Sequence, residues 1–341
     1  IRVARREPLA ESYHYESLDP DFKEFTAQAE ELVAAETGLR SLSGPARARV
    51  TDRAGWIRAN LASFRRLLRP LTDRLGERVG TGPVMSMGRS VAGAEVGALL
   101  GWMSTRVLGQ YDLLIIENEH PEDQDIVYYV GPNVLALEKR YAFPPKEFRL
   151  WLALHEVTHR AQFTGVSWMR EYFLSLVDSS LAAFDPDPKR LVEALRRAVD
   201  QMRAGDNPLD EGGLVTLLAS PEQHAVLQQI QGLMSLLEGH GDLTMDGAAA
   251  GRVPSAPRFR QVLHQRRQSG GAARLVRKLV GIDAKLRQYE EGEKFLEAIS
   301  AADRRNIELL WLGPEWIPSL PEIKRPDLWL ARAASASAAT A

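Results

Sequence analysis

The chain has 341 residues, 45% of them hydrophobic and 26% charged, which is typical of a globular protein of one or two domains and excludes a disordered chain. Its 43 Lys and Arg residues nearly balance its 45 Asp and Glu residues, so the net charge gives no general attraction to nucleic acid or to an anionic membrane. The absence of cysteine excludes disulfides, thiolate nucleophiles and cysteine-bound zinc.

The first third of the chain is predicted to be helical. Residues 21–38 have the apolar periodicity of an amphipathic helix, and two longer helical patterns cover about residues 45–76 and 84–109. The most apolar stretch, residues 91–108, contains charged side chains and therefore falls short of a membrane span. The first residues contain arginines but no apolar core, unlike a signal peptide. We therefore expect a cytoplasmic protein without a membrane partner.

The hydrophobic period changes after residue 110. Residues 111–118 and 126–139 are rich in β-branched and aromatic residues, and Gly131-Pro132 interrupts the second stretch. Such short runs predict two or three strands, separated by an acidic turn at residues 120–125. They are the only β-structure that the sequence predicts.

Helical patterns return after these strands. A helix is predicted to begin at Pro144-Pro145, because proline suits a first turn, and to continue to about Phe163. A second strong helix start is the serine cap Ser220 with glutamine three residues later, and its helix runs at least to Leu237. Further helices are predicted at residues 166–184 and 189–202 and within 258–312, followed by a proline-rich segment at 313–326.

The predicted fold class is mainly α-helical with one small β-sheet. The chain is divided into an N-terminal helical region at residues 1–83, a core with C-terminal helices at residues 84–330, and a low-complexity, disordered tail at residues 331–341. The first two regions are also compatible with one continuous domain.

One short motif indicates the chemistry. Residues 155–159 read His-Glu-Val-Thr-His, the HExxH pattern of zinc sites. Histidines four residues apart lie one turn above each other on a helix, so both imidazoles can bind one metal ion. Glu156 then projects beside them, where it can take a proton from a zinc-bound water. We predict that His155 and His159 bind Zn²⁺ and that Glu156 is the general base.

A catalytic zinc site needs a third protein ligand. Residues 233–245 are its strongest source, because Glu238, His240 and Asp242 follow an apolar helical face there. Glycines flank the histidine, although each costs a helix about 1 kcal/mol relative to alanine. That cost is easier to understand where the backbone lies close to another group. The remaining histidines are expected to be surface or capping residues: His14, His120, His224 and His264.

An HExxH motif followed by a helix with Glu-x-x-x-Asp resembles the gluzincin branch of zinc metallopeptidases. More closely, the chain resembles a zincin-like hydrolase family of actinobacteria and their relatives, some members of which are associated with biosynthesis of the deazaflavin redox coenzyme. The matching stretches are residues 108–114, 130–134, 154–163, 236–242, 287–295 and 311–329. The resemblance implies a zincin-like metallopeptidase core embedded in a helical array. The metzincin pattern does not fit, because Gln162 stands where that pattern has glycine.

The gluzincin resemblance implies that Glu238 is the third zinc ligand and that Asp242 supports a ligand histidine, for which we expect His155. Helix geometry agrees with this. On a continuous helix Glu238 and Asp242 share a face, and His240 points about 200° away, where it could stabilise an oxyanion. If Gly239 ended the helix, His240 could bind the metal instead. Other candidate oxyanion donors are Tyr289, Tyr128 and Tyr129.

We predict a zinc-dependent hydrolase of peptide or amide bonds, similar to metallopeptidases, in which Glu156 activates the water. An extended peptide would lie along the strand at residues 127–130 or 133–137. The alternatives are a zinc amidase or esterase that acts on a small non-peptide substrate, and a non-catalytic metal-binding scaffold. No nucleic-acid site is expected, because the basic residues at 266–267 and 274–278 lie on helices that also carry acids.

Overall fold

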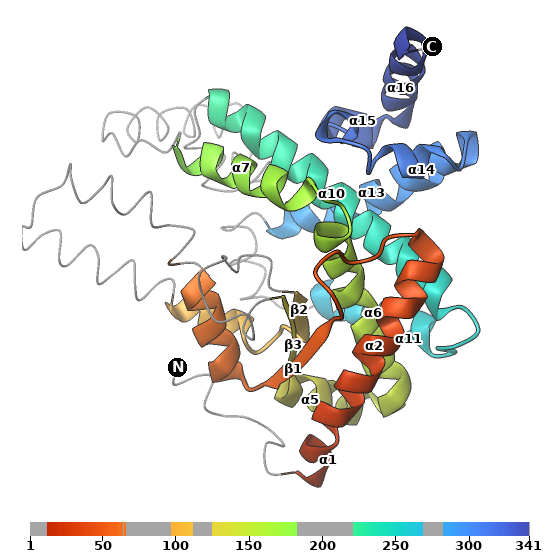
Figure 1. Ribbon diagram of the computed structural model, residues 1–341. Helices are drawn as coiled ribbons and strands as arrows, with labels where there is room; N and C mark the ends of the chain where they lie inside the picture. Colours follow the sequence, from red (N-terminus) through yellow and green to blue (C-terminus); the bar gives the residue numbers. More distant parts are fainter. Residues whose placement is uncertain are drawn as a thin grey trace, which may run out of the picture. The chain divides into compact units, whose positions relative to one another are not determined.

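The computed structural model describes residues 12–63, 65, 97–111, 125–182, 221–268 and 282–340 (Figure 1). The chain forms two compact units, one of Ile1–Gly165 with Thr244–Arg260 and one of Val166–Leu243 with Gln261–Ala341. As predicted, the described residues are mostly helical with one small sheet. The predicted domain boundary at residue 83 lies outside the described residues. None of the helices in the described parts is long and apolar enough to cross a membrane.

The sheet of the first unit has three strands, β1 (Arg47–Thr51), β2 (Gly109–Tyr111) and β3 (Ile126–Val130). Their order is β1-β3-β2, with β1 parallel and β2 antiparallel to β3. All five residues of β3 are buried, as is usual for a central strand. The sequence predicts β2 to start at residue 111 and to continue to 118, and residues 112–124 lie outside the described part.

Two predicted elements of this unit are wrong. Residues 47–51 were expected within a helix but form β1, and the described helix starts only at residue 53. Pairing with the buried strand β3 outweighs local helix preference there. Residues 131–139 were expected as a strand but belong to helix α5 (Gly131–Tyr141). Pro132 sits in the first turn of α5, where its missing N–H and fixed φ are tolerated.

The first unit also contains the helices α1 (Tyr13–Glu16), α2 (Leu18–Thr37) and α6 (Pro145–Thr164). The predicted helices at residues 21–38 and 144–163 are therefore confirmed. Helix α2 ends at Gly38, whose φ of 72° suits glycine. Its buried face includes Phe22, and that ring stacks on Tyr129 of β3 with centroids 3.8 Å apart. The apolar faces of α2 and α6 thus close the core over the sheet (Figure 1).

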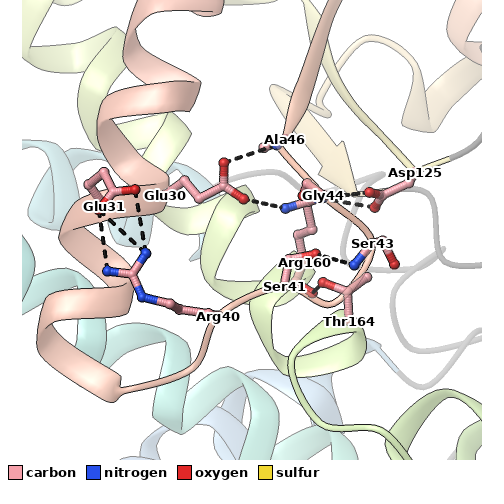
Figure 2. Close-up of polar contacts among 10 residues, drawn as sticks. All are labelled: Glu30, Glu31, Arg40, Ser41, Ser43, Gly44, Ala46, Asp125, Arg160 and Thr164. Carbon is pink, nitrogen blue, oxygen red and sulfur yellow. Dashed lines mark hydrogen bonds and ion pairs between the residues drawn. The ribbon is translucent and has the colours of Figure 1, made fainter.

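Arg160, which directly follows the HExxH motif, is a buried anchor of α6. Its guanidinium donates to the carboxylate of Asp125, to Glu30 Oε1 at 2.7 Å and to the carbonyl of Gly44 at 2.6 Å. Glu30 Oε2 in turn accepts from the N–H of Ala46 at 3.0 Å. Figure 2 shows how this network ties α6 to α2, to the loop before β1 and to the residue before β3. Burial lowers the pKa of Arg160, but Asp125 and Glu30 outweigh that effect and raise it.

Replacement of Arg160 by alanine is expected to destabilise the protein by about 3 kcal/mol, because Asp125 and Glu30 would lose their cation in a mostly buried site. The matched control is Arg40→Ala. Arg40 also pairs with a carboxylate of α2, Glu31, but the Arg40 side chain is 67% exposed against 1% for Arg160. The control should therefore cost less than about 1 kcal/mol. Urea unfolding measures both values, and equal losses would contradict the assignment of Arg160 as an anchor.

In the described residues of the second unit, all regular elements are helices. Its elements are α7 (Met169–Ala182), the first part of α10 (Pro221–Ala249), the last part of α11 (Ala256–Gln268), α13 (Ile282–Ala302), α14 (Asn306–Leu309), the short 3-10 helix η2 (Pro314–Trp316), α15 (Leu320–Lys324) and α16 (Pro326–Thr340). The helices predicted at 166–184, from 220 and within 258–312 are confirmed, and that at 189–202 lies outside the described residues. Helix α16 extends into the alanine-rich tail that was expected to be disordered, in keeping with the high helix propensity of alanine.

The core of the second unit is built from α10, α13 and the C-terminal helices. It contains the buried side chains Leu236, Phe295, Leu296, Ile299, Leu310, Ile323 and Trp329. Two glycines bring α10 and α13 close together. A Cβ added to Gly239 would lie 2.4 Å from the backbone of Gly292, and one added to Gly292 would lie 2.0 Å from that of Ser235. Gly239 therefore serves close packing of two backbones and does not end its helix.

Candidate metal centre

Helix α6 carries the HExxH motif without interruption, as predicted. Its first turn contains Pro145, and a row of apolar residues buries the helix on both sides of the motif. His155 and His159 lie one turn apart, both half-buried, with ring centroids 4.7 Å apart and an interplanar angle of 84°. The two imidazoles therefore face a common region, as two ligands of one ion must.

One nitrogen of each imidazole contacts a neighbouring side chain. His159 Nδ1 lies 3.0 Å from the side-chain carbonyl oxygen of Gln162, and His155 Nδ1 lies 3.2 Å from the sulfur of Met245. In both rings Nε2 is thus the nitrogen turned away from these contacts and suited to a metal. Asp242, expected to accept a hydrogen bond from His155, is half-buried on the same helix as Met245, and its supporting role stays a prediction.

The carboxylate of Glu156 lies against strand β2. Only 6% of the residue is exposed, and its Oε2 accepts the backbone N–H of Tyr111 at 3.1 Å. A Cβ added to Gly109 would lie 2.5 Å from Oε1 of Glu156, so the carboxylate occupies the space that a side chain would need. The donor therefore belongs to the backbone of β2, and Gly109 gives the carboxylate access to it.

The pairing of β2 explains why this backbone donor is available. The N–H of Val130 donates to the carbonyl of Leu108 at 2.8 Å, so these two residues form a hydrogen-bonded pair between β2 and β3. Such pairs alternate along an antiparallel ladder, so Gln110 and Tyr128 form the next one. The N–H groups of Gly109 and Tyr111 consequently point away from β3. Within the described sheet β2 is an edge strand, β3 is central, and residues 133–137 are helical. The expectation that 127–130 or 133–137 forms the substrate edge is therefore wrong.

The side chain of Gln110 points to the face of β2 opposite Gly109 and also holds the strand in place. The side-chain oxygen of Gln110 accepts from Trp56 Nε1 at 2.7 Å, and Gln110 also exchanges hydrogen bonds with the amide of Asn60. Trp56 and Asn60 belong to the helix at residues 53–63. This helix and α6 thus hold β2 through different residues of the strand.

Two of the predicted tyrosine donors, Tyr128 and Tyr129, are buried. The hydroxyl of Tyr129 bonds to Thr26 at 2.8 Å in the core, and the residue has no exposed surface. Burial raises the pKa of Tyr129, with a further increase from the charge of Glu156, although the bond to Thr26 opposes both. Tyr128 is also buried, beneath the guanidinium of Arg49. The side chain of Tyr289 lies outside the described residues.

Helix α10 is continuous from Pro221 to Ala249, so the alternative in which Gly239 ends the helix is wrong. Glu238 is half-buried on this helix. It precedes Met245 by two turns and shares its face, whereas His240 lies about 140° around the helix from Met245. Met245 is the residue that contacts His155. His240 is 5% exposed, and its ring meets Trp311 edge-on with centroids 4.8 Å apart.

These three residues offer a set of metal ligands. His155, His159 and Glu238 each contribute one ligand atom, and all three atoms lie within 4.8 Å of one another. Among the described residues, no other set of three His, Asp or Glu side chains has ligand atoms this close together. Two imidazole nitrogens and one carboxylate oxygen fit zinc and leave a fourth position for water or substrate.

Residues 2–330 match the family model described as zincin-like metallopeptidase. The chain belongs to the zincin-like metallopeptidase family. This assignment confirms the predicted resemblance to a zincin-like family, and it covers nearly the whole chain.

Among solved structures, this member of the family is similar to a crystal structure from Chloroflexus aurantiacus described as a "putative hydrolase with a novel fold". The two chains are 30% identical, with a TM-score of 0.70 over 98% of this chain and 95% of the other. No curated protein matches the chain. Family and neighbour together support a hydrolase of the zincin type.

Three contacts of the site were not predicted from the sequence. Gln162 lies three residues after His159, a spacing that brings side chains together on a helix, so this contact could have been found. Met245 follows Glu238 by two turns, which could also have been read from the sequence. The contact of Tyr111 with Glu156 uses a backbone N–H, and no residue type in the sequence indicates it.

Proposed function

We propose that this protein is a zinc-dependent hydrolase of peptide or amide bonds, in which His155, His159 and Glu238 bind the metal. The observation that carries the proposal is the group of three ligand atoms within 4.8 Å of one another. Its composition of two nitrogens and one oxygen is that of open, catalytic zinc sites, whereas structural zinc sites usually have four protein ligands.

Glu156 is the proposed general base. It lies next to His155 on α6 but outside the ligand group, and its buried carboxylate is held by a backbone N–H. Bound zinc would polarise the scissile carbonyl and lower the pKa of water. Glu156 would take a proton from the attacking water and return it to the leaving amine. A buried carboxylate beside the ligands, and not among them, has this use in catalysis and none in a purely structural metal site.

The edge of β2 supports a peptide or an extended amide as substrate. The backbone N–H and carbonyl groups of Gly109 face away from β3, and such an edge can pair with an extended chain. Gly109 lies against Glu156, so a chain bound there would pass close to the base. Asp242 as a support for His155, His240 as an oxyanion donor and the cytoplasmic location remain proposals beside this one.

The function is tested by metal analysis of protein purified without chelator or added metal, followed by a screen against peptide libraries and small amides and esters. We expect about one zinc per chain, the number that three ligands of one site can hold, and cleavage of peptides. Cleavage of small amides alone would select the amidase alternative. Stoichiometric zinc with no hydrolysis of either class would contradict the proposal and favour a metal-binding scaffold.

The third ligand is tested by comparing Glu238→Ala with His240→Ala. Loss of Glu238 should weaken zinc binding by more than the 10–100-fold typical of losing an outer partner of a ligand, because a ligand itself is lost. His240→Ala should keep zinc, since the ring of His240 packs on Trp311. Zinc affinity is measured by competition with a chelator, and circular dichroism checks that both variants fold. If His240→Ala loses zinc while Glu238→Ala keeps it, the assignment of Glu238 is wrong.

A further inference from the structure

We propose that Gln162 orients His159 for the metal, its side-chain carbonyl accepting the Nδ1–H of His159 so that the Nε2 lone pair is presented to zinc. This inference rests on the proposed metal site and adds a positioning residue to it.

The geometry of Gln162 carries the inference. Gln162 lies on α6, has no exposed surface, and its Oε1 is 3.0 Å from Nδ1 of His159. A neutral imidazole carries one proton, on Nδ1 or on Nε2. Because an amide carbonyl can only accept, this contact is a hydrogen bond when the proton is on Nδ1. The tautomer with a free Nε2 lone pair, which a metal requires, is therefore the favoured one.

The Nδ1 of the other motif histidine, His155, contacts a different kind of side chain. Nδ1 of His155 lies 3.2 Å from the thioether sulfur of Met245, and a thioether is a weak acceptor. These two Nδ1 contacts thus differ in the strength of the acceptor. Loss of the amide of Gln162 should consequently affect the metal site more than a change of Met245 to another unbranched apolar side chain.

Burial of an amide also requires a reason. A fully buried amide lowers stability unless it is hydrogen-bonded, whereas an apolar side chain of similar length would fill the same space without that cost. Thr158, another buried polar side chain of α6, bonds to the backbone of its own helix at Leu154. Gln162 instead directs its carbonyl at a motif histidine.

The test compares Gln162→Met with Gln162→Glu. Methionine keeps the length of the side chain but removes the amide carbonyl, and we expect zinc affinity to fall 10–100-fold, as for other lost partners of ligand histidines. Glutamate keeps an acceptor at the same position, so affinity should be kept or increased. If Gln162 only fills space, the order reverses, because methionine is tolerated and a buried carboxylate is not. That reversed order in a chelator competition titration would overturn the proposal.

A second measurement uses the wild-type protein without metal. Nitrogen-15 NMR of the histidine rings, at a pH where the imidazole is neutral, reports which nitrogen carries the proton, and His159→Ala identifies the signal. We expect the Nδ1–H form for His159, and a mixture of forms in Gln162→Met. A predominant Nε2–H form in the wild-type protein would refute the inference. This readout does not depend on zinc, so it stands even if the wild-type protein binds no metal and the proposed function fails.

Discussion

The variant in which both His155 and His159 are replaced by alanine is expected to contain no zinc. Two of the three proposed ligands disappear, and a single carboxylate does not hold zinc against water. Both histidines are half-buried and contact other residues of the core, so circular dichroism must show that the variant folds. Elemental analysis of the purified protein measures the zinc content.

The matched control also removes two histidines, at His14 and His264. Both are exposed, and neither belongs to the ligand group. This control variant should contain as much zinc as the wild-type protein. Stoichiometric zinc in the His155/His159 variant would mean that the motif is not the metal site, and equal loss in both variants would point to unspecific binding by histidines.

Replacement of Glu156 by glutamine should leave the zinc content unchanged and reduce hydrolysis by at least about 100-fold, the effect of losing a general base. The amide has nearly the shape of the carboxylate, and its oxygen can still accept the N–H of Tyr111, so the contact to β2 survives. The carboxylate that takes the proton is lost. The hydrolysis rate on the best substrate from the screen and the zinc content are measured on the same preparation.

The control for this variant is Glu147→Gln. Glu147 lies in the first turn of the same helix, and its carboxylate likewise accepts a backbone N–H, that of Ser255 at 2.8 Å. It lies more than two turns from the motif, so the control should retain both zinc and activity. An active Glu156→Gln protein would show that the water is activated by another group.

The long helices could be predicted because their pattern repeats over several turns. Helices α2 and α6 bury regular apolar faces, and such faces are visible in a single sequence. β1 could not be predicted in this way. Its five residues are too few to show a period, and they form a strand because β3 offers them a parallel partner. The proline of α5 was misread, since the same residue can interrupt a strand or begin a helix.

The proposed metal ligands could be chosen from the sequence because they lie on helices, where the spacing of residues determines the direction of their side chains. His155 and His159 share a face of α6, and Glu238 could be chosen over His240 on a continuous α10. The partners of Glu156 were out of reach for the opposite reason. They depend on how β2 pairs with β3, and residues 108–111 alone do not reveal which of their N–H groups face outward.

The register of the sheet therefore carries chemical information. A shift of β2 by one residue along β3 would exchange the inward and outward backbone groups of the strand. The N–H that now meets Glu156 would turn to β3, and the side chain of Gln110 would take the space that Gly109 leaves for the carboxylate. The bonds of Gln110 to Trp56 and Asn60 oppose such a slip. The helix at residues 53–63, about a hundred residues before the motif in the sequence, thereby keeps β2 in the register that brings the N–H of Tyr111 to the proposed base.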